Sequence, residues 1–159
     1  MAERIRAQAS GEGVPFEIPG ASGGPFRIEM LNEDAAAGVV TTIIHIPAGA
    51  RIPAHRHSAG AEMHYVLEGD LVEAGEALGP GAFLTHAAGV VHGPHESRSG
   101  ARVLTVQQWQ SREGSFDFEP ADQPSEAAPA ASEGVPEPIG DTQRQDRRAA
   151  EQALGKGYG

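Results

Sequence analysis

The stretch GARIPAHRHSAGAEMHYVLEG, residues 49–69, carries most of the information about the fold. His55 and His57 are two residues apart, and side chains at this spacing lie on the same face of an extended strand or turn. Glu62 stands at the start of the apolar segment that follows, 63–67, and can present a carboxylate to the same point. The stretch therefore predicts strands that bring two imidazoles and one carboxylate together.

A fourth metal ligand has to come from farther along the chain, and His92 is the best candidate. The sequence around it, Gly89-Val-Val-His-Gly-Pro94, is typical of a tight turn that delivers a side chain into a strand. Three imidazoles and one carboxylate suit a divalent first-row metal such as iron, manganese, nickel or zinc. The chain has no cysteine, which excludes thiolate metal sites and disulfides and leaves nitrogen and oxygen ligands.

The spacing of these residues matches a known pattern. Gly49, five residues, His55-Arg-His57, four residues, Glu62, six residues and Gly69 reproduce the first signature motif of the cupin superfamily. Residues 81–96 have the spacing of the second motif, with Ala87 in place of the usual proline and Glu96 in place of the usual asparagine. The chain therefore resembles the cupins over about residues 25–109, and its short interval between the motifs is similar to that of ChrR-type cupins and small mononuclear dioxygenases.

The resemblance implies a double-stranded β-helix, the jelly-roll barrel, as the fold. Position by position, it makes His55, His57, Glu62 and His92 the ligands of one divalent transition metal per chain. Fe2+ is favoured, and Mn2+, Ni2+ and Zn2+ are the alternatives. The remaining interpretation is a barrel without metal in which these groups satisfy one another, although burying three histidines and a carboxylate together without an ion is costly.

Outside the motifs, the sequence predicts an all-β body over residues 25–118. Its apolar segments are short and rich in β-branched residues, as strands are. Turn signals such as Asn32-Glu-Asp34 and Gly79-Pro-Gly81 separate them. The predicted strands are 26–31, 39–46, 63–67, 82–85 and 102–109.

Both ends of the chain have the composition of loosely structured segments. Residues 1–24 are rich in Gly and Pro, and they predict a flexible arm with one short extended piece around residues 16–18. Residues 119–159 are rich in Pro and Ala, with too few branched apolar residues to offset the entropy of ordering them. We expect this tail to be disordered or weakly helical, with a short helix over 141–154.

Besides Glu62, the candidates for catalysis are His64 and Arg51. His64 follows Glu62 by two residues, so it should face the same cavity and act as an acid–base group near neutral pH. The equally supported alternative is a histidine that only lines the barrel. Arg51 precedes His55 at even spacing and is predicted to point inward and bind an anionic group of the substrate, with a position on the rim as the alternative.

The surroundings of the site follow from strand parity. His86 and His95 are expected at the pocket mouth or on the surface, because the turn at 87–89 breaks the alternation, and His45 is expected to pack against a neighbouring strand. Met63, Tyr65 and Leu67 have the opposite parity to Glu62, so they should cover the other face of their strand as filling or as a dimer contact. The apolar wall expected to exclude water consists of Ile44, Ile46, Val66, Phe83 and Val91.

Charge and hydropathy exclude several classes of partner. The 12 Lys and Arg residues and the 22 Asp and Glu residues give a net charge of −10, so nucleic acid and anionic membranes are not expected partners. The longest apolar stretch, 39–46, is far shorter than the roughly 20 residues of a transmembrane helix. The first ten residues include Glu3, Arg4 and Arg6 and no apolar core of a secretion signal, so we expect a cytoplasmic protein.

The favoured function is that of a metal-dependent cupin enzyme acting on a small enolisable or oxygenated organic molecule. A mononuclear metal dioxygenase is the leading interpretation, since a redox-active ion can both bind an enolate and react with dioxygen. The alternatives are a redox-neutral lyase, isomerase or cyclase at the same site, and a non-catalytic module that senses a ligand or metal. The expected partners are a small-molecule substrate and a second copy of the chain in a homodimer.

Overall fold

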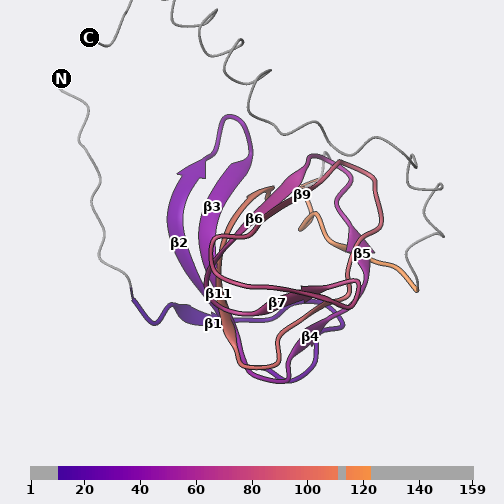
Figure 1. The fold of residues 1–159 in the computed structure, drawn as a ribbon. Helices are drawn as coiled ribbons and strands as arrows, with labels where there is room; N and C mark the ends of the chain where they lie inside the picture. Colours follow the sequence, from indigo (N-terminus) through magenta and orange to yellow (C-terminus); the bar gives the residue numbers. More distant parts are fainter. Residues whose placement is uncertain (1–10, 111–113, 123–159) are drawn as a thin grey trace, which may run out of the picture. The chain divides into compact units, whose positions relative to one another are not determined.

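Twelve strands and no helix make up the part of the chain that the computed structural model describes, residues 11–110 and 114–122 (Figure 1). The all-β prediction is therefore confirmed. The helix predicted over 141–154 and most of the predicted tail lie outside the described residues. Within the described residues, no helix is long and apolar enough to cross a membrane.

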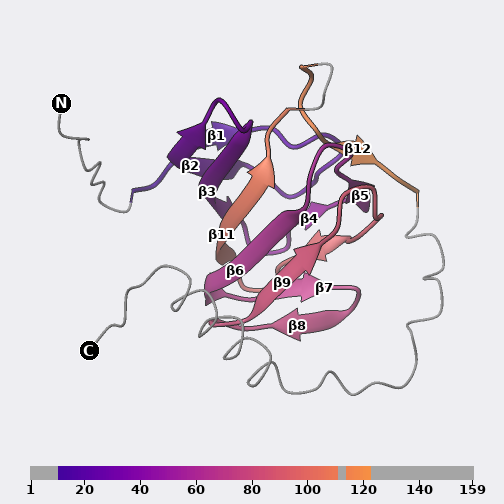
Figure 2. The same cartoon turned by 90° about the horizontal axis from the view of Figure 1, so that it is seen from above.

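Six strands form the larger sheet, and every pairing in it is antiparallel. Each of the five predicted strands, 26–31, 39–46, 63–67, 82–85 and 102–109, coincides with a strand of this sheet, so the β-branched runs located them correctly. Figure 2 shows the large sheet with its strands in spatial order. That order is β1 (Val14–Phe16), β2 (Phe26–Asp34), β3 (Val39–Ile46), β11 (Ala101–Gln108), β6 (Glu62–Gly69) and β9 (Phe83–His86).

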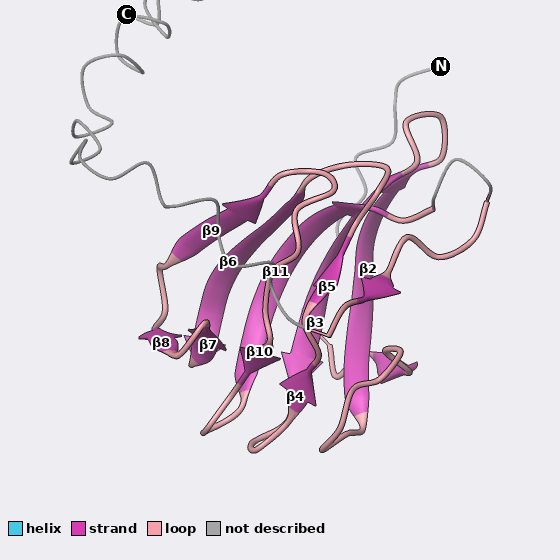
Figure 3. Ribbon diagram, turned by 90° about the vertical axis from the view of Figure 1, so that its right-hand side faces the viewer, coloured by secondary structure: helices cyan, strands magenta, loops and turns pink. Residues whose placement is uncertain are grey.

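The remaining strands are only two or three residues long. A strand of this length shows no alternation of apolar and polar residues, which is why the sequence does not predict it. Figure 3 shows four of them in a row, and the last two form a separate pair. The row is β4 (Arg51–Ile52), β10 (His95–Glu96), β7 (Leu71–Glu73) and β8 (Glu76–Leu78), and the pair is β12 (Glu119–Pro120) with β5 (His55–Arg56).

The core lies between the two larger sheets. Val66 and Val103, paired in register on β6 and β11, are almost completely buried, and Leu71 of β7 packs in the same cluster. Burial alternates along β6, so Glu62, His64 and Val66 point inward and the exposed Met63 and Tyr65 point outward. The predicted parity of this strand is thus confirmed, and it directs a carboxylate and an imidazole into the barrel.

Both ends of the barrel extend beyond the predicted boundaries. Part of the predicted arm is a strand: β1 pairs with β2 through Val14 and Phe16, slightly before the extended piece expected at 16–18. The Phe16 ring contacts the rings of Trp109 and Phe116. At the other end, β12 pairs with β5 two residues past the predicted limit at 118. Segments outside the predicted body therefore cover the end of the barrel where β5 lies.

The turn that ends the first motif needs a glycine. Gly69 has a φ of 75°, and a Cβ atom on it would lie 1.8 Å from the carbonyl oxygen of Gly100. No other residue fits such an approach without moving the backbone. The motif glycine thus fixes how closely the end of β6 approaches the start of β11.

Asp70, in the same turn, ties it to the loop before β11. Its carboxylate accepts hydrogen bonds from the backbone N–H groups of Arg98 (3.0 Å) and Ser99 (2.8 Å) and from the Ser99 hydroxyl. Hydrogen bonds from Ser99 and Arg98 lower the pKa of Asp70 from 3.8 to about 2. Because the folded pKa lies below the unfolded value, the ionised carboxylate stabilises the fold above the unfolded pKa, and this contribution is lost as the pH falls through the folded pKa.

We therefore expect Asp70→Asn to lower the free energy of unfolding by about 1 kcal/mol at pH 7, a value reduced for the solvent exposure of this turn. Urea denaturation at pH 7 and at successively lower pH measures it. The difference between the two proteins should shrink as the pH falls from 3.8 toward about 2. If Asp70→Asn lowers the free energy of unfolding by the same amount at every pH in that range, the charge of Asp70 plays no part.

Candidate metal centre

Glu62 lies at the middle of a buried cluster of histidines. Only 4% of the residue is exposed, although a carboxylate is rarely buried without a compensating partner. Each of the five nearest imidazoles turns its Nε2 atom toward this carboxylate. The distances from Nε2 to the nearer Glu62 oxygen are 2.9 Å for His64, 3.0 Å for His92, 3.3 Å for His57, 3.8 Å for His55 and 3.9 Å for His95.

The four predicted ligands come together through backbone pairing between the two motifs. The N–H of His55 donates to the carbonyl of His92 at 3.0 Å, and the N–H of His92 donates to the carbonyl of His55 at 2.9 Å. His57 follows two residues after His55, and Glu62 enters from β6. Residues far apart in the sequence thus present three imidazoles and one carboxylate to one place.

Backbone carbonyls fix the tautomer of these three imidazoles. The Nδ1 atom of His55 lies 2.8 Å from the carbonyl of Pro53, that of His92 lies 3.0 Å from the carbonyl of Val90, and that of His57 contacts the carbonyl of Asp117. A carbonyl only accepts hydrogen bonds, so each Nδ1 carries a proton and each ring turns its Nε2 toward Glu62, where in the neutral form the lone pair of that atom can bind a cation. Histidines that bind metals are held in this way.

The cluster fits a divalent cation. The buried Nε2 atoms of His57, His64 and His95 have no hydrogen-bond partner. The contacts of His57 and His64 with Glu62 are poorly aligned, and that of His95 is too long. Buried polar atoms without a partner are costly, and several lone pairs that converge on one carboxylate are what a cation satisfies. The donors are nitrogen and oxygen only, as the lack of cysteine requires.

The electrostatics of the cluster keep Glu62 ionised. Burial alone would raise the pKa of Glu62, but the charge of His64 and the contacts from His55 and His57 hold it well below its usual range. Burial also lowers the pKa of His55 and of His64, which favours their neutral, metal-binding form. For His57, burial is outweighed by Glu62 and the carbonyl of Asp117, which raise its pKa. The centre therefore combines an ionised carboxylate with two imidazoles, His55 and His64, whose neutral form is favoured by burial.

His95 belongs to this cluster, and the prediction that it lies at the mouth or surface is wrong. Only 3% of the residue is exposed, because the short strand β10 turns it inward after the turn at 87–89. Its Nδ1 contacts the carboxylate of Glu73 on β7, which also accepts the N–H of Gly93 at 2.9 Å. Burial alone would lower the pKa of His95, but Glu62 and Glu73 raise it to about 9.

His86 is half-buried at the edge of the cluster rather than on the open surface. Its Nε2 lies 3.3 Å from Glu73, and its ring stacks on that of His92 with centroids 3.9 Å apart. The Glu73 carboxylate thus contacts both His86 and His95. Neither Glu73 nor the inward position of His95 is visible in the sequence, since β7 and β10 are too short to show parity.

Arg51 is not part of the centre, so the prediction that it points inward is wrong. Half of its side chain is exposed, and its Nε lies 3.2 Å from the carboxylate of Glu96. The alternation of β4 explains this position, because Ile52 is the residue of that strand that turns into the core. The alternative position on the rim is the one the structure shows.

A small apolar cavity of about 30 Å³ adjoins the cluster. Ile44 of the predicted wall lines it, while Ile46 and Val66 lie deeper in the core. The prediction for Phe83 is wrong: it is 61% exposed, because its register opposite Tyr65 places it on the outer face. Four aromatic side chains also line the cavity, namely Phe16, Trp109, Phe116 and Phe118.

The segment 114–120 holds this aromatic cap over the cluster. Phe118 stacks on the ring of His55 with centroids 4.2 Å apart. Between the two phenylalanines, the buried carboxylate of Asp117 accepts hydrogen bonds from the backbone N–H of Ser58, the Ser58 hydroxyl and the N–H of Ala59, at 2.8–2.9 Å. Asp117 therefore anchors the loop that carries His57.

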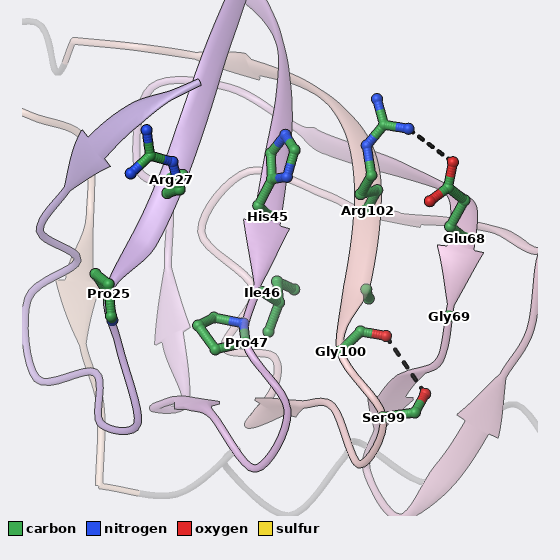
Figure 4. A pocket seen from close by; sticks show the side chains of 11 residues that line it. Pro25, Arg27, His45, Ile46, Pro47, Glu68, Gly69, Ser99, Gly100 and Arg102 are labelled. Carbon is green, nitrogen blue, oxygen red and sulfur yellow. Dashed lines mark hydrogen bonds and ion pairs between the residues drawn. The ribbon is translucent and has the colours of Figure 1, made fainter. Parts of the chain in front are cut away.

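A larger pocket of about 480 Å³ lies away from the cluster (Figure 4). Its polar groups already contact one another: Nε2 of His45 lies 2.6 Å from the buried carboxylate of Glu29, and Arg102 lies 2.7 Å from Glu68. His45 thus contacts a neighbouring strand, β2, as expected. The pocket shows no cluster of ligands comparable to the one around Glu62.

The chain resembles solved structures in its fold and matches one protein family in its sequence. Solved structures with a similar fold include an acetylacetone dioxygenase from Acinetobacter johnsonii (TM-score 0.58, 17% identity, 73% of this chain and 83% of that chain covered). They also include the polyketide cyclase RemF from Streptomyces resistomycificus (TM-score 0.52, 24% identity, 65% of this chain and 78% of that chain covered). No curated protein sequence matches the chain. The family described as ChrR Cupin-like domain matches residues 18–123. The cupin resemblance is thereby confirmed, and the chain belongs to the ChrR cupin-like family.

Proposed function

We propose that this protein is a metal-dependent cupin enzyme that acts on a small enolisable or oxygenated organic molecule, with dioxygen-dependent cleavage as its reaction. The observation that carries the proposal is the convergence of buried imidazole Nε2 atoms on the ionised Glu62. A merely structural core gains nothing from burying these groups together, whereas a Lewis-acid site requires them.

In this proposal, His55, His57, His92 and Glu62 hold one divalent ion. When bound, the ion supplies Lewis acidity toward an enolate and, if it is iron, electron exchange with dioxygen. The backbone carbonyls of Pro53, Val90 and Asp117 keep the three rings oriented.

Proton transfer from an enolisable substrate would fall to Glu62 and His64. Oε2 of Glu62 and Nε2 of His64 lie 2.9 Å apart, so a small rotation of either side chain would align them for transfer of a proton. The Thr105 hydroxyl, 2.9 Å from Nδ1 of His64, holds that ring in place. His64 thus keeps, in this proposal, the acid–base role expected of it from the sequence.

The cavity beside the cluster limits the size of the substrate. Its volume of about 30 Å³ accommodates water-sized groups, so an organic substrate has to displace part of the aromatic cap. Phe118 is the cap residue that stacks on a predicted ligand, His55, so its side chain is the first that a substrate would displace. The same cap keeps bulk water away from the ligands.

Metal analysis and oxygen uptake on one preparation of the full chain test the proposal. Protein purified without chelator or affinity tag should carry a transition metal, and an oxygen electrode should record its consumption of dioxygen with small 1,3-diketones. His92→Ala should abolish the uptake, and His45→Ala, a histidine outside the cluster, should not. Turnover of the diketone without oxygen uptake would replace the dioxygenase by a redox-neutral lyase, isomerase or cyclase. If the metal-loaded protein turns over no enolisable compound, the proposal of an enzyme is overturned and a non-catalytic sensing module remains.

A further inference from the structure

We infer that the barrel holds a second divalent metal ion, bound by His64, His86 and His95, with Glu62 bridging it to the first. The inference rests on the proposed function for the first ion. It goes beyond that function because it assigns these three histidines, which lie outside the cupin motif positions, to a second metal site.

The geometry divides the six buried or half-buried histidines into two sets around one carboxylate. Glu62, His64, His86 and His95 offer ligand atoms that all lie within 4.8 Å of one another. His55 and His92 lie close to the same carboxylate on the side of β5, together with His57. His95 is within reach of both positions, since it also groups with His55, Glu62 and His92. His64 and His86 therefore belong only to the second group of ligand atoms, and His55 and His92 only to the first.

The second set has the supporting contacts that metal-binding histidines require. Nδ1 of His95 contacts the Glu73 carboxylate, and Nδ1 of His64 lies 2.9 Å from the Thr105 hydroxyl. Both rings therefore turn Nε2 toward Glu62, as the rings of the first set do. A histidine held between a carboxylate and a metal ion is a recurrent arrangement in metalloproteins.

Unpartnered atoms indicate that something is bound at the second set. His64 and His95 are at least 95% buried, and their Nε2 atoms have no hydrogen-bond partner. Nδ1 of His86 is likewise buried without a partner. A single ion held by the first set could reach Nε2 of His95 but would leave Nε2 of His64 and Nδ1 of His86 unsatisfied, whereas a second ion would satisfy them.

The charge of the site is compatible with two cations. Glu62 supplies one bridging carboxylate, and Glu73 supplies a second negative charge directly behind His86 and His95. Two ions that share a carboxylate commonly lie about 3.5–4 Å apart and bind both oxygens of a substrate. With the second ion in place, His64 is a ligand, and the acid–base role proposed for it applies only to a centre that holds one ion.

The test is the number of ions that the full chain binds. Chelator-stripped protein titrated with Mn2+ and followed by equilibrium dialysis should bind two ions per chain, and its electron paramagnetic resonance spectrum should show the coupling of two neighbouring Mn2+ ions. His86→Ala should bind one ion and lose the coupling. His57→Ala should also lose the coupling, because it weakens the other site. The matched control, His45→Ala, should still bind two.

The outcomes separate this inference from the proposed function. One ion per wild-type chain at saturating Mn2+, without coupling, would overturn the second site and leave the first intact. Two ions in the His86→Ala protein would also overturn it. No bound ion at all would overturn both proposals. His86 is half-buried on a sheet edge, so its removal should not unfold the barrel, and the wild-type measurement decides the matter without any variant.

Discussion

The Glu62→Gln protein should bind divalent metal at least about 100-fold more weakly than the wild type, since even loss of a supporting contact costs about 10–100-fold in affinity. The substitution keeps the shape of the side chain and removes the one negative charge that five imidazoles surround. It also directs the N–H groups of an amide at the position between residue 62 and the ring nitrogens where the metal ion would bind. Dialysis against Mn2+ or Zn2+ measures the affinity, and circular dichroism checks that the sheet remains.

The matched control for this prediction is Glu68→Gln, on the same strand. Glu68 is exposed and pairs with Arg102 on the outer face, so its substitution should leave metal affinity within about threefold of wild type and stability nearly unchanged. If Glu62→Gln behaves like Glu68→Gln, the carboxylate is not a ligand and the centre is held by histidines alone. If the Glu62→Gln protein fails to fold, the metal affinity of single histidine variants is measured instead.

Asp117→Ala should lower the free energy of unfolding by about 3 kcal/mol, because hydrogen bonds to a charged group contribute about 1.5–3 kcal/mol and their loss leaves buried donors unpaired. The donors concerned are Ser58 and Ala59, in the loop that carries His57. The backbone carbonyl of residue 117, which contacts the His57 ring, remains in this variant, but the loop and the segment lose the hydrogen bonds that fix them against each other. Metal affinity should therefore also fall, by about 10–100-fold. Urea denaturation and metal titration of the same samples measure both effects.

Glu119→Gln provides the comparison for Asp117→Ala. It neutralises a carboxylate two residues away whose partner, Arg56, is exposed, so the expected change in stability is below about 0.5 kcal/mol. Asp117→Asn should lie between the two variants, because its amide still accepts from Ser58 but faces the N–H of Ala59 with a donor. Equal stability of the Asp117→Ala and Glu119→Gln proteins would show that this carboxylate does not anchor the loop.

The long strands of this fold were predictable because each has a residue pattern of its own. The alternation along β6 places Glu62 and His64 inside and Tyr65 outside, and the motif spacing locates His55, His57 and His92. These features depend on local geometry, which a sequence records directly.

The rest of the site depends on pairings that local pattern does not contain. Whether His95 faces inward is decided by its pairing with Ile52 and Glu73 across two sheet partners, and Glu73 itself lies on a three-residue strand. Phe83 faces outward because of its register against β6. The anchoring role of Asp117 arises from a contact across 58–60 residues of sequence. Contacts between residues this far apart depend on how the whole barrel packs, which no local stretch of sequence records.

The covering of the barrel end by β1 and β12 has a practical consequence for truncation. A shortened protein that spans only residues 25–118 would keep every predicted metal ligand, yet it would lack Phe16 and the pairing of Glu119 with Arg56. Trp109 and Phe116 would then be open to solvent on the side where Phe16 now packs. Loss of activity in such a fragment would indicate that water reaches the centre, not that a ligand is missing. Fragments of this chain should therefore begin no later than Gly11, whose N–H donates to Glu29, and end no earlier than Ala121, whose N–H donates to the carbonyl of Ala54.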